Sequence, residues 1–288
     1  MKAKVREFYA NANYKHLMLI PLAVLLVSVG VLAYTHQTTG EWFARSAELR
    51  GGTQLTLIIE GDADVPSLQR ALEQKFGDAT VRELGGVSGR GLLVSVGDAD
   101  PVEVADVVKE NGVVVSDFSY QQIGPALGEA FWRQSRVAFI IAFVFMAIVV
   151  FIAFRSFVPS IAVIQAAVTN VVGTLAVMQL LDIELSLASF AGLMLIIGYS
   201  VDTDILLTTR MLKRGGDVVS RVISAAKTGL TMTLTALIAL FALYATATTS
   251  TLSDIAAVLI IALLIDVPAT YLMNGGLIRW HLEKRGRA

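Results

Sequence analysis

Six long apolar runs constrain this 288-residue chain more than any other feature of its sequence. At 1.5 Å per residue, a helix needs about 20 apolar residues to cross the ~30 Å hydrocarbon core of a membrane. Hydrophobic residues make up 55% of the chain and charged residues 16%, so lipid must form part of its environment. We predict an α-helical polytopic membrane protein with six transmembrane helices. The runs lie near Leu17 to Tyr34, Val137 to Phe154, Ile161 to Leu181, Leu185 to Leu207, Leu230 to Thr246 and Ile255 to Met273.

Basic residues predict the orientation of these helices, because cytoplasmic loops collect Lys and Arg. The loops on the opposite side contain Asp182, Glu184 and Asp254 and no Lys or Arg. We expect a multi-pass protein of the cytoplasmic (cell) membrane with both termini in the cytoplasm, residues 1–36 holding the N-terminus and a retained first helix, and residues 275–288 forming a basic tail. The basic residues that predict this are Lys2, Lys4, Arg6, Lys15, Arg155, Arg210, Lys213, Arg214, Arg221, Lys227, Arg279, Lys284, Arg285 and Arg287.

The segment between the first two helices, residues 37–134, is polar and contains 15 acidic against 8 basic residues. Its residue pattern predicts elements in the order β-α-β-β-α-β, which is the order of an α+β ferredoxin-like domain. Pro66 and Pro101 stand near the two predicted helix starts, where a missing N–H costs least. We expect this domain outside the cytoplasm, followed by helices two to six in residues 135–274. The predicted elements are 54–60, 65–76, 80–84, 92–96, 101–110 and 113–118.

The composition excludes several kinds of site. The chain has no Cys, so disulfides, thiolate catalysis and Cys-ligated metals are excluded. His16, His36 and His281 flank the apolar runs, which argues against a histidine proton relay or a metal centre inside the membrane. The charge distribution gives no support for nucleic-acid binding. We expect no metal, no cofactor and no enzymatic activity.

Three carboxyl groups interrupt the apolar runs: Asp202 and Asp204 in the fourth, and Asp266 in the sixth. A charged group at the centre of a bilayer costs about 2.5 to 3.5 kcal/mol on insertion scales, so such groups face a protein interior and serve a function. A carboxyl group in an apolar environment can bind and release protons near neutral pH, which a proton-coupled machine requires. All three are therefore candidate proton-linked residues.

Counting from the cytoplasmic helix ends places polar residues of four helices at a similar depth. Asp202 and Asp266 are each eight residues from such an end, which is roughly 12 Å at 1.5 Å per residue. Thr235 of helix five and Asn170 of helix three lie at comparable depths. We predict one polar layer of these four residues. Pro268, just after Asp266, loosens the backbone ladder and permits a bend.

The residues alone leave open which carboxyl of helix four points inward. Asp202 and Asp204 are two positions apart, about 200° around a helix, so they cannot face the same partner. Asp204 shares its stripe with Ser200 and Thr208, and Asp202 shares its own with Gly198 and Tyr199. We prefer Asp202 as the proton-linked residue. Asp204 is alternatively a hydrated carboxyl near Arg210.

Four motifs, in this order along the chain, resemble the SecF members of the SecD/SecF family in the resistance-nodulation-division superfamily. The first is Leu49-Arg-Gly-Gly-Thr-Gln-Leu55, which contains Gly51, Gly52 and Thr53. The second is Ile123-Gly-Pro-Ala-Leu-Gly-Glu129, which contains Gly124 and Pro125. The third is Gly198-Tyr-Ser-Val-Asp-Thr-Asp204, with Tyr199 inside it and Arg210 after it. The fourth is the Thr-rich start of helix five, which follows a basic loop.

This resemblance implies that the chain pairs with SecD and associates with the Sec translocon, a SecYE-type channel. It further implies that the pair promotes export of a secreted preprotein with the energy of the proton motive force. The third motif departs from the family pattern, since SecF proteins often read Gly-Tyr-Ser-Val-Asn-Asp. Here Asp202 takes the Asn position and Thr203 the Asp position, with Asp204 following. The variant indicates an archaeal-type member.

Two other functions stay open at this point. An intramembrane aspartyl protease would use Asp202 and Asp266 as general acid and base. Such enzymes have a Gly-x-Gly-Asp element, which neither aspartate supplies. A small-molecule or lipid exporter subunit of the same superfamily is the other alternative, although exporters normally bring twelve helices and two external domains in one polypeptide. The residues also leave open whether the coupling ion is H⁺ or Na⁺.

Overall fold

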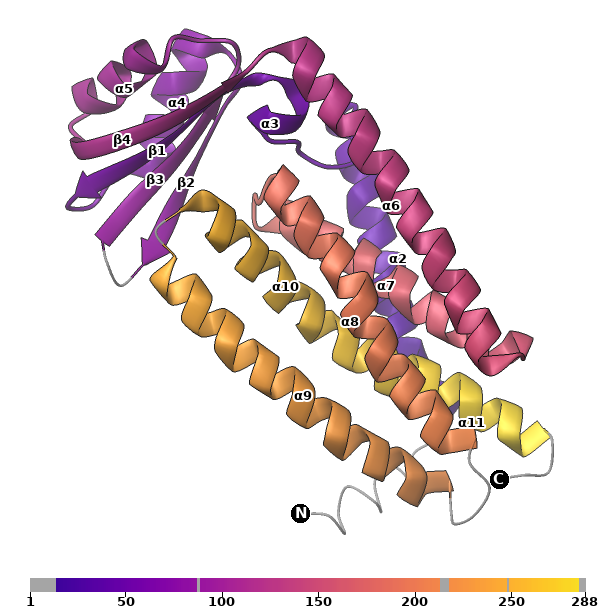
Figure 1. Ribbon diagram of the computed structural model, residues 1–288. Coiled ribbons are helices and arrows are strands. Elements are labelled where there is room, and N and C mark those ends of the chain that lie inside the picture. Colours follow the sequence, from indigo (N-terminus) through magenta and orange to yellow (C-terminus); the bar gives the residue numbers. More distant parts are fainter. Residues whose placement is uncertain (1–13, 87–88, 213–217, 248, 285–288) are drawn as a thin grey trace.

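A bundle of long helices carries a small domain of strands and helices at one end (Figure 1). The computed structural model describes residues 14–86, 89–212, 218–247 and 249–284. In these ranges six helices are long and apolar enough to cross a membrane, which confirms the predicted number. They are α2 (Tyr14–Thr39), α6 (Pro125–Phe154), α7 (Phe157–Leu180), α8 (Leu187–Leu212), α9 (Val218–Thr246) and the continuous run of α10 (Ser250–Pro268), η1 (Ala269–Asn274) and α11 (Gly275–Lys284).

Several helices extend beyond the apolar runs that predict them. Helix α6 begins twelve residues before Val137, at Pro125, and α9 begins twelve residues before Leu230, at Val218. The added turns contain charged residues such as Arg133 and Lys227, so hydropathy does not register them although the backbone remains helical. An apolar run therefore marks the part of a helix suited to hydrocarbon and not its ends.

The domain between α2 and α6 has the predicted order of elements. A short helix, α3 (Ala47–Arg50), precedes them. The four strands form one antiparallel sheet in the order β2-β3-β1-β4, and α4 and α5 pack on it around a core that includes Leu55, Leu57 and Val94. Strand β4 runs five residues past the predicted end at Phe118, because it pairs with β1 as far as Ile123. The elements are β1 (Gly52–Glu60), α4 (Val65–Phe76), β2 (Ala79–Gly86), β3 (Gly89–Val96), α5 (Pro101–Glu110) and β4 (Val114–Ile123).

Both helices of this domain begin as their prolines predict. Pro66 and Pro101 occupy the first turn of α4 and α5. The Asp64 side chain accepts a hydrogen bond from the Ser67 backbone N–H at 3.3 Å, and the Asp100 side chain accepts one from Val102 at 2.8 Å. Each aspartate satisfies an N–H group that the helix itself leaves unpaired.

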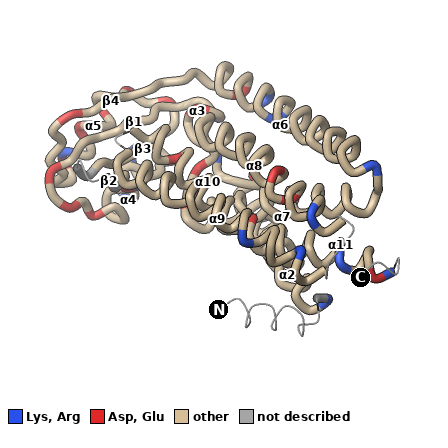
Figure 2. The backbone as a smooth tube through the Cα atoms, turned by 60° about the horizontal axis from the view of Figure 1, so that its bottom comes forward, with Lys and Arg blue, Asp and Glu red and all other residues tan. Residues whose placement is uncertain are grey.

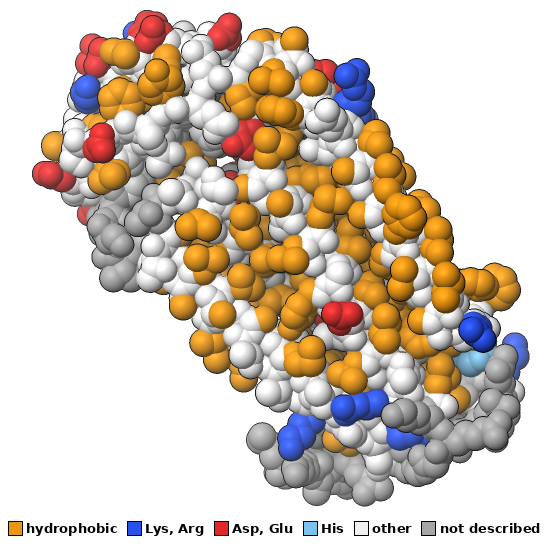
Figure 3. All heavy atoms as spheres, in the orientation of Figure 1, with side chains coloured by type: hydrophobic (Ala, Val, Ile, Leu, Met, Phe, Trp, Pro, Cys, Tyr) orange, Lys and Arg blue, Asp and Glu red, His pale blue; other side chains and the backbone are white. Residues whose placement is uncertain are grey.

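Charge and hydrophobicity divide the molecule into zones. Acidic residues gather on the small domain, and basic residues gather at the opposite end of the bundle, where α2 begins and α11 ends (Figure 2). Hydrophobic side chains cover the side of the bundle between these zones (Figure 3). This distribution matches a bundle surrounded by lipid. Seven basic residues of the orientation argument lie outside the described residues: Lys2, Lys4, Arg6, Lys213, Arg214, Arg285 and Arg287.

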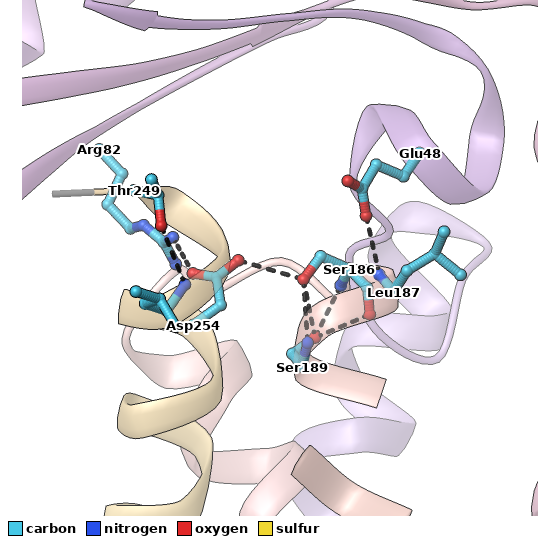
Figure 4. Close-up of polar contacts among 8 residues, drawn as sticks. Glu48, Arg82, Ser186, Leu187, Ser189, Thr249 and Asp254 are labelled. Atoms are coloured by element: carbon cyan, nitrogen blue, oxygen red, sulfur yellow. Dashed lines mark hydrogen bonds and ion pairs between the residues drawn. The ribbon is translucent and has the colours of Figure 1, made fainter. Parts of the chain in front are cut away.

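The small domain rests on the ends of α8 and α10 through polar contacts (Figure 4). Arg82 of β2 forms an ion pair with Asp254, near the start of α10. Asp254 also accepts a hydrogen bond from the Ser186 hydroxyl at 3.1 Å, and the Leu187 backbone N–H donates to Glu48 at 2.9 Å. Polar contacts from β2 and from α3 therefore hold the domain against the bundle.

Candidate functional site

Two stripes of polar side chains face one another inside the helix bundle. One stripe lies on α8 and the other continues from α10 into η1, and each repeats every four residues, which keeps its members on one helix face. Helix α7 adds Asn170. All seven side chains are buried, and apolar clusters of the bundle lie around them. The α8 stripe is Ser200, Asp204 and Thr208, and the second stripe is Asp266, Thr270 and Asn274.

Asp266 is the most densely bonded carboxyl of this cluster. Asn170 Nδ2 donates to its Oδ1 at 3.2 Å, and the Ser200 hydroxyl donates to the same oxygen. The hydroxyl groups of Thr270 and Thr203 lie 3.4 Å from Oδ1 and 3.2 Å from Oδ2, respectively. Donors from α7, α8 and η1 therefore meet on one carboxyl group of α10, so its charge acts on all of these helices.

Asp204 has a single bonded oxygen. Its side chain is completely buried, and Asn274 Nδ2 donates to Oδ1 at 2.7 Å. Among the described residues, no side chain or backbone group donates to Asp204 Oδ2, and Asn274 Oδ1 likewise has no hydrogen-bond partner. The carboxyl groups of Asp204 and Asp266 lie close enough to interact electrostatically. Two interacting buried carboxyls, with Oδ2 of Asp204 open to accept a proton, are suited to exchange of a proton.

A π-helix places the second stripe. Pro268, at the end of α10, lacks the N–H of a regular turn, and the backbone continues as the six-residue π-helix η1. The sequence predicts a bend at Pro268, and the structure has a change of helical register there. Tyr271 of η1 packs against α9, where a Cβ on Gly229 would lie 2.0 Å from the Tyr271 hydroxyl oxygen. The glycine therefore allows the close contact between α9 and η1.

The predicted polar layer is right for Asn170 and Asp266 and wrong for the other two residues. Asp202 is exposed on the outer face of α8, next to Gly198, and this face is flanked by α6 and α9. Thr235 is exposed too, and its hydroxyl donates to the Thr231 carbonyl at 2.9 Å. Asp202 thus lies on the outer face of α8 and Asp266 inside the bundle, which removes the geometry that a protease dyad requires.

Arg210 is not the neighbour of Asp204 that the sequence suggests. Its Nη1 donates to the Ser224 carbonyl at 2.7 Å and lies 3.1 Å from the Thr228 hydroxyl, so it joins α8 to α9. Asp204 lies in the bundle interior instead, on the stripe that it shares with Ser200 and Thr208. The half-buried Tyr199 belongs to neither carboxyl's hydrogen-bond set.

Sequence reasoning did not assign Thr203, Thr270 or Asn274 to the site. The four-residue spacing of Asp266, Thr270 and Asn274 could have identified the last two, because the same spacing relates Ser200, Asp204 and Thr208. The interpretation of Asn274 as the end of helix six is wrong, because α11 continues to Lys284.

The two glycine motifs outside the bundle touch one another. Gly51 has φ +87°, and a Cβ there would lie 2.5 Å from the Pro125 Cα; a Cβ on Gly128 would lie 2.5 Å from the Gly51 backbone nitrogen. The buried Thr53 hydroxyl donates to the Ala99 carbonyl at 2.7 Å, which fixes the start of β1. Together they form the joint between the small domain and α6. Gly124 precedes α6 as its N-cap residue.

Another buried carboxyl lies beneath the sheet. Glu184, in the loop between α7 and α8, accepts a hydrogen bond from the Thr80 hydroxyl at 3.0 Å and lies 3.5 Å from the Arg50 guanidinium. Burial raises the pKa of Glu184, and the opposing effects of Arg50 and of its hydrogen bonds are smaller. Its charge state therefore affects how the domain sits on the bundle.

Comparisons with known proteins agree on one family. Residues 103–284 match the family model described as protein export membrane protein SecD/SecF, C-terminal. The protein-export membrane protein SecF of Methanothermobacter thermautotrophicus is 38% identical over 280 residues, which cover 95% of this chain and 94% of the relative. SecF of Pyrococcus furiosus is 38% identical over 277 residues, which cover 94% of this chain and 92% of the relative.

The fold is similar to a solved structure. The crystal structure of SecDF from Thermus thermophilus, which is described as a translocon-associated membrane protein, matches with a TM-score of 0.73 at 21% identity. The match covers 94% of this chain and 38% of that chain, so this chain corresponds to a minor part of the SecDF polypeptide.

Proposed function

Because this chain belongs to the SecF family of protein-export membrane proteins, we propose that it is an auxiliary subunit of the Sec protein translocase. It pairs with SecD and promotes export of preproteins through the SecYE-type channel with the proton motive force. The family consists of transport proteins and not of enzymes. The observation that carries the proposal is the buried pair Asp204 and Asp266, joined to three helices in a membrane bundle.

In this proposal, Asp204 and Asp266 are the proton-linked residues. A proton that arrives on either carboxyl removes a charge and supplies an O–H donor where an acceptor was. The hydrogen bonds of Asn170, Ser200, Thr203 and Asn274 must then rearrange, and they belong to α7, α8 and η1. Proton binding thereby changes the contacts among these helices, and proton release restores them.

The proposed arrangement in the cell follows the charge distribution. The termini lie in the cytoplasm, and the domain of about residues 37–134 lies outside as a ferredoxin-like domain. The sheet order β2-β3-β1-β4 and the positions of α4 and α5 support that assignment. Acidic residues on this domain and basic residues at the opposite end support the orientation (Figure 2).

SecD covers the outer face of α8 in this proposal. That face carries Leu195, Gly198 and Asp202, all exposed. An aspartate facing lipid costs about 2.5 to 3.5 kcal/mol on insertion scales, so a protein partner or water must surround it. Asp202 then belongs to the contact with SecD, while the proton-linked carboxyls lie behind it.

The functional test is export by membranes that contain SecD and this chain. We expect Asp266→Asn to abolish the proton-dependent stimulation of preprotein export, because Asn cannot bind or release the proton. The amount of inserted protein should stay unchanged, since Asn keeps the size of the side chain. Asp106→Asn, at an exposed position of α5, is the matched control and should export like the wild type. Full stimulation in the Asp266→Asn protein would remove this carboxyl from the mechanism.

A further inference from the structure

A groove opens on the side of the bundle near the start of α2 and the end of α11. It runs between α2, α7 and the η1–α11 segment, and its volume is about 370 Å³, within the range of small-molecule sites. Its wall is almost wholly apolar, with Lys15, Gln165 and Trp280 as the exceptions. The apolar wall consists of Met18, Leu19, Leu22, Met273 and Leu277.

Polar and apolar groups are ordered along this groove. Lys15 lies in the first turn of α2, and Leu22 lies seven residues further along. At 1.5 Å per residue this is roughly 10 Å of helix from the charged end into the apolar part. Trp280 of α11 is 41% exposed, and the Lys284 ammonium lies 5.3 Å from its ring centre. The acidic neighbour Glu283 is paired with Arg279 at 3.2 Å.

This order matches one kind of ligand. Tryptophan concentrates where hydrocarbon meets the headgroups, and basic pockets between transmembrane helices bind anionic headgroups. A phospholipid presents a negative phosphate followed by an apolar chain. The groove has the same order, with Lys15 at its charged end, Lys284 beside Trp280, and then the apolar wall. We propose that the groove is a binding site for an anionic phospholipid, with the headgroup at Lys15, Lys284 and Trp280 and one acyl chain along α2.

The site is separate from the cluster of Asp204 and Asp266. Its lining side chains come from α2, α7, η1 and α11 and include none from α8. Bound lipid would join α2 to α11, so it would fix the first helix against the end of the sixth. The inference therefore does not depend on the proposed role in export.

Fluorescence quenching tests the site directly. Trp42→Phe and Trp132→Phe leave Trp280 as the single tryptophan. This protein is placed in vesicles that mix phosphatidylcholine and phosphatidylglycerol, with bromine on the acyl chains of one lipid or the other. Brominated phosphatidylglycerol should quench Trp280 more strongly than brominated phosphatidylcholine at equal mole fraction, with a preference of roughly fivefold for each lysine that contacts the headgroup.

Substitutions distinguish a specific lipid-binding site from nonspecific contact with the surrounding bilayer. Lys15→Gln with Lys284→Gln should reduce quenching by phosphatidylglycerol to the level of phosphatidylcholine. Lys227→Gln, an exposed lysine on α9 away from the groove, should leave the preference unchanged. Leu22→Phe should weaken quenching by narrowing the apolar part. Equal quenching by both lipids in the parent protein, a preference that survives loss of both lysines, or a groove closed to lipid by another segment would overturn the proposal.

Discussion

At the scale of single residues, the joint between the small domain and the bundle depends on glycines, which have no side chain. Gly51 adopts φ +87°, a backbone conformation that residues with a side chain rarely adopt. A Cβ at this position would also collide with the backbone of Pro125. Gly128 closes the same contact from α6. Both glycine motifs therefore serve one packing contact.

Gly51→Ala should destabilise the protein through strain and through collision with Pro125. Gly61 provides the matched control, because its φ is +91° and nothing lies within 4 Å of its Cβ position. Gly61→Ala should cost only the backbone strain, about 1 kcal/mol, and Gly51→Ala should cost about 1–3 kcal/mol more. Thermal unfolding of both purified variants measures the difference. Equal losses would mean that the contact with Pro125 relaxes freely.

Glu184 makes the stability depend on pH. Its pKa is raised by burial, so the folded state holds the proton more tightly than the unfolded state does. This contribution is complete below the unfolded pKa and is lost as pH rises through the folded pKa. Glu184→Gln does not titrate at this position, so the wild type should lose stability relative to it over the pH range above the ordinary Glu pKa of about 4.3.

Melting temperatures across this range measure the effect. The exposed Glu83→Gln, on β2, serves as the control and should show no such trend relative to the wild type. A wild type that gains stability over Glu184→Gln with rising pH would contradict the assigned cause.

The sequence pattern predicted which helices contribute to the buried cluster better than it predicted which helix face points into it. Asp204 and Asp202 are two positions apart on opposite faces of one helix, so the choice between them required the positions of the neighbouring helices. The stripe of Ser200, Asp204 and Thr208 is a property of α8 alone and could be read directly. The bonds from Asn170 and Asn274 required knowledge of how α7 and η1 pack, which periodicity does not contain.

At the scale of elements, α8 has two polar faces with different environments. Its inner face meets α10 and α7, and its outer face, with Gly198 and Asp202, is left open between α6 and α9. Glycine on an exposed helix face allows another helix to approach closely. The outer face is therefore where we expect SecD.

A large side chain at this position should block pairing. Gly198 has open space around its Cβ position, so Gly198→Trp should fold normally but reduce recovery of SecD in affinity purification from native membranes. We expect at least about a tenfold loss, which corresponds to about 1.4 kcal/mol. Leu26→Trp, on the exposed side of α2, should recover SecD like the wild type. Undiminished recovery with Gly198→Trp would place the SecD contact elsewhere.

Element types could be predicted from the sequence and element ends could not. The order of strands and helices in the small domain follows from local alternation and from its prolines. The extra turns of α6 and α9 and the π-helix after Pro268 follow from packing and from a missing N–H, so hydropathy does not reveal them.

At the scale of the whole molecule, the carboxyl cluster lies inside the bundle, apart from the domain that rests on its outer end. Asp204 and Asp266 connect helices that also carry this domain, since α10 bears Asp254 and the loop before α8 bears Glu184. A change of charge in the cluster can therefore reach the domain through continuous helices. That path is a proposal, and it requires that the cluster exchanges protons.

Infrared spectroscopy of the purified protein during a pH titration tests this requirement most directly, because a protonated carboxyl has its own C=O stretching band. Every Asp and Glu of the chain contributes to this band on acidification, so the cluster is identified by difference. We predict that the wild type and Asp106→Asn share a component that grows on acidification and that is missing from the variant carrying Asp204→Asn and Asp266→Asn together. Identical titrations in the wild type and in this double variant would contradict the assignment of the buried pair as the proton-binding site.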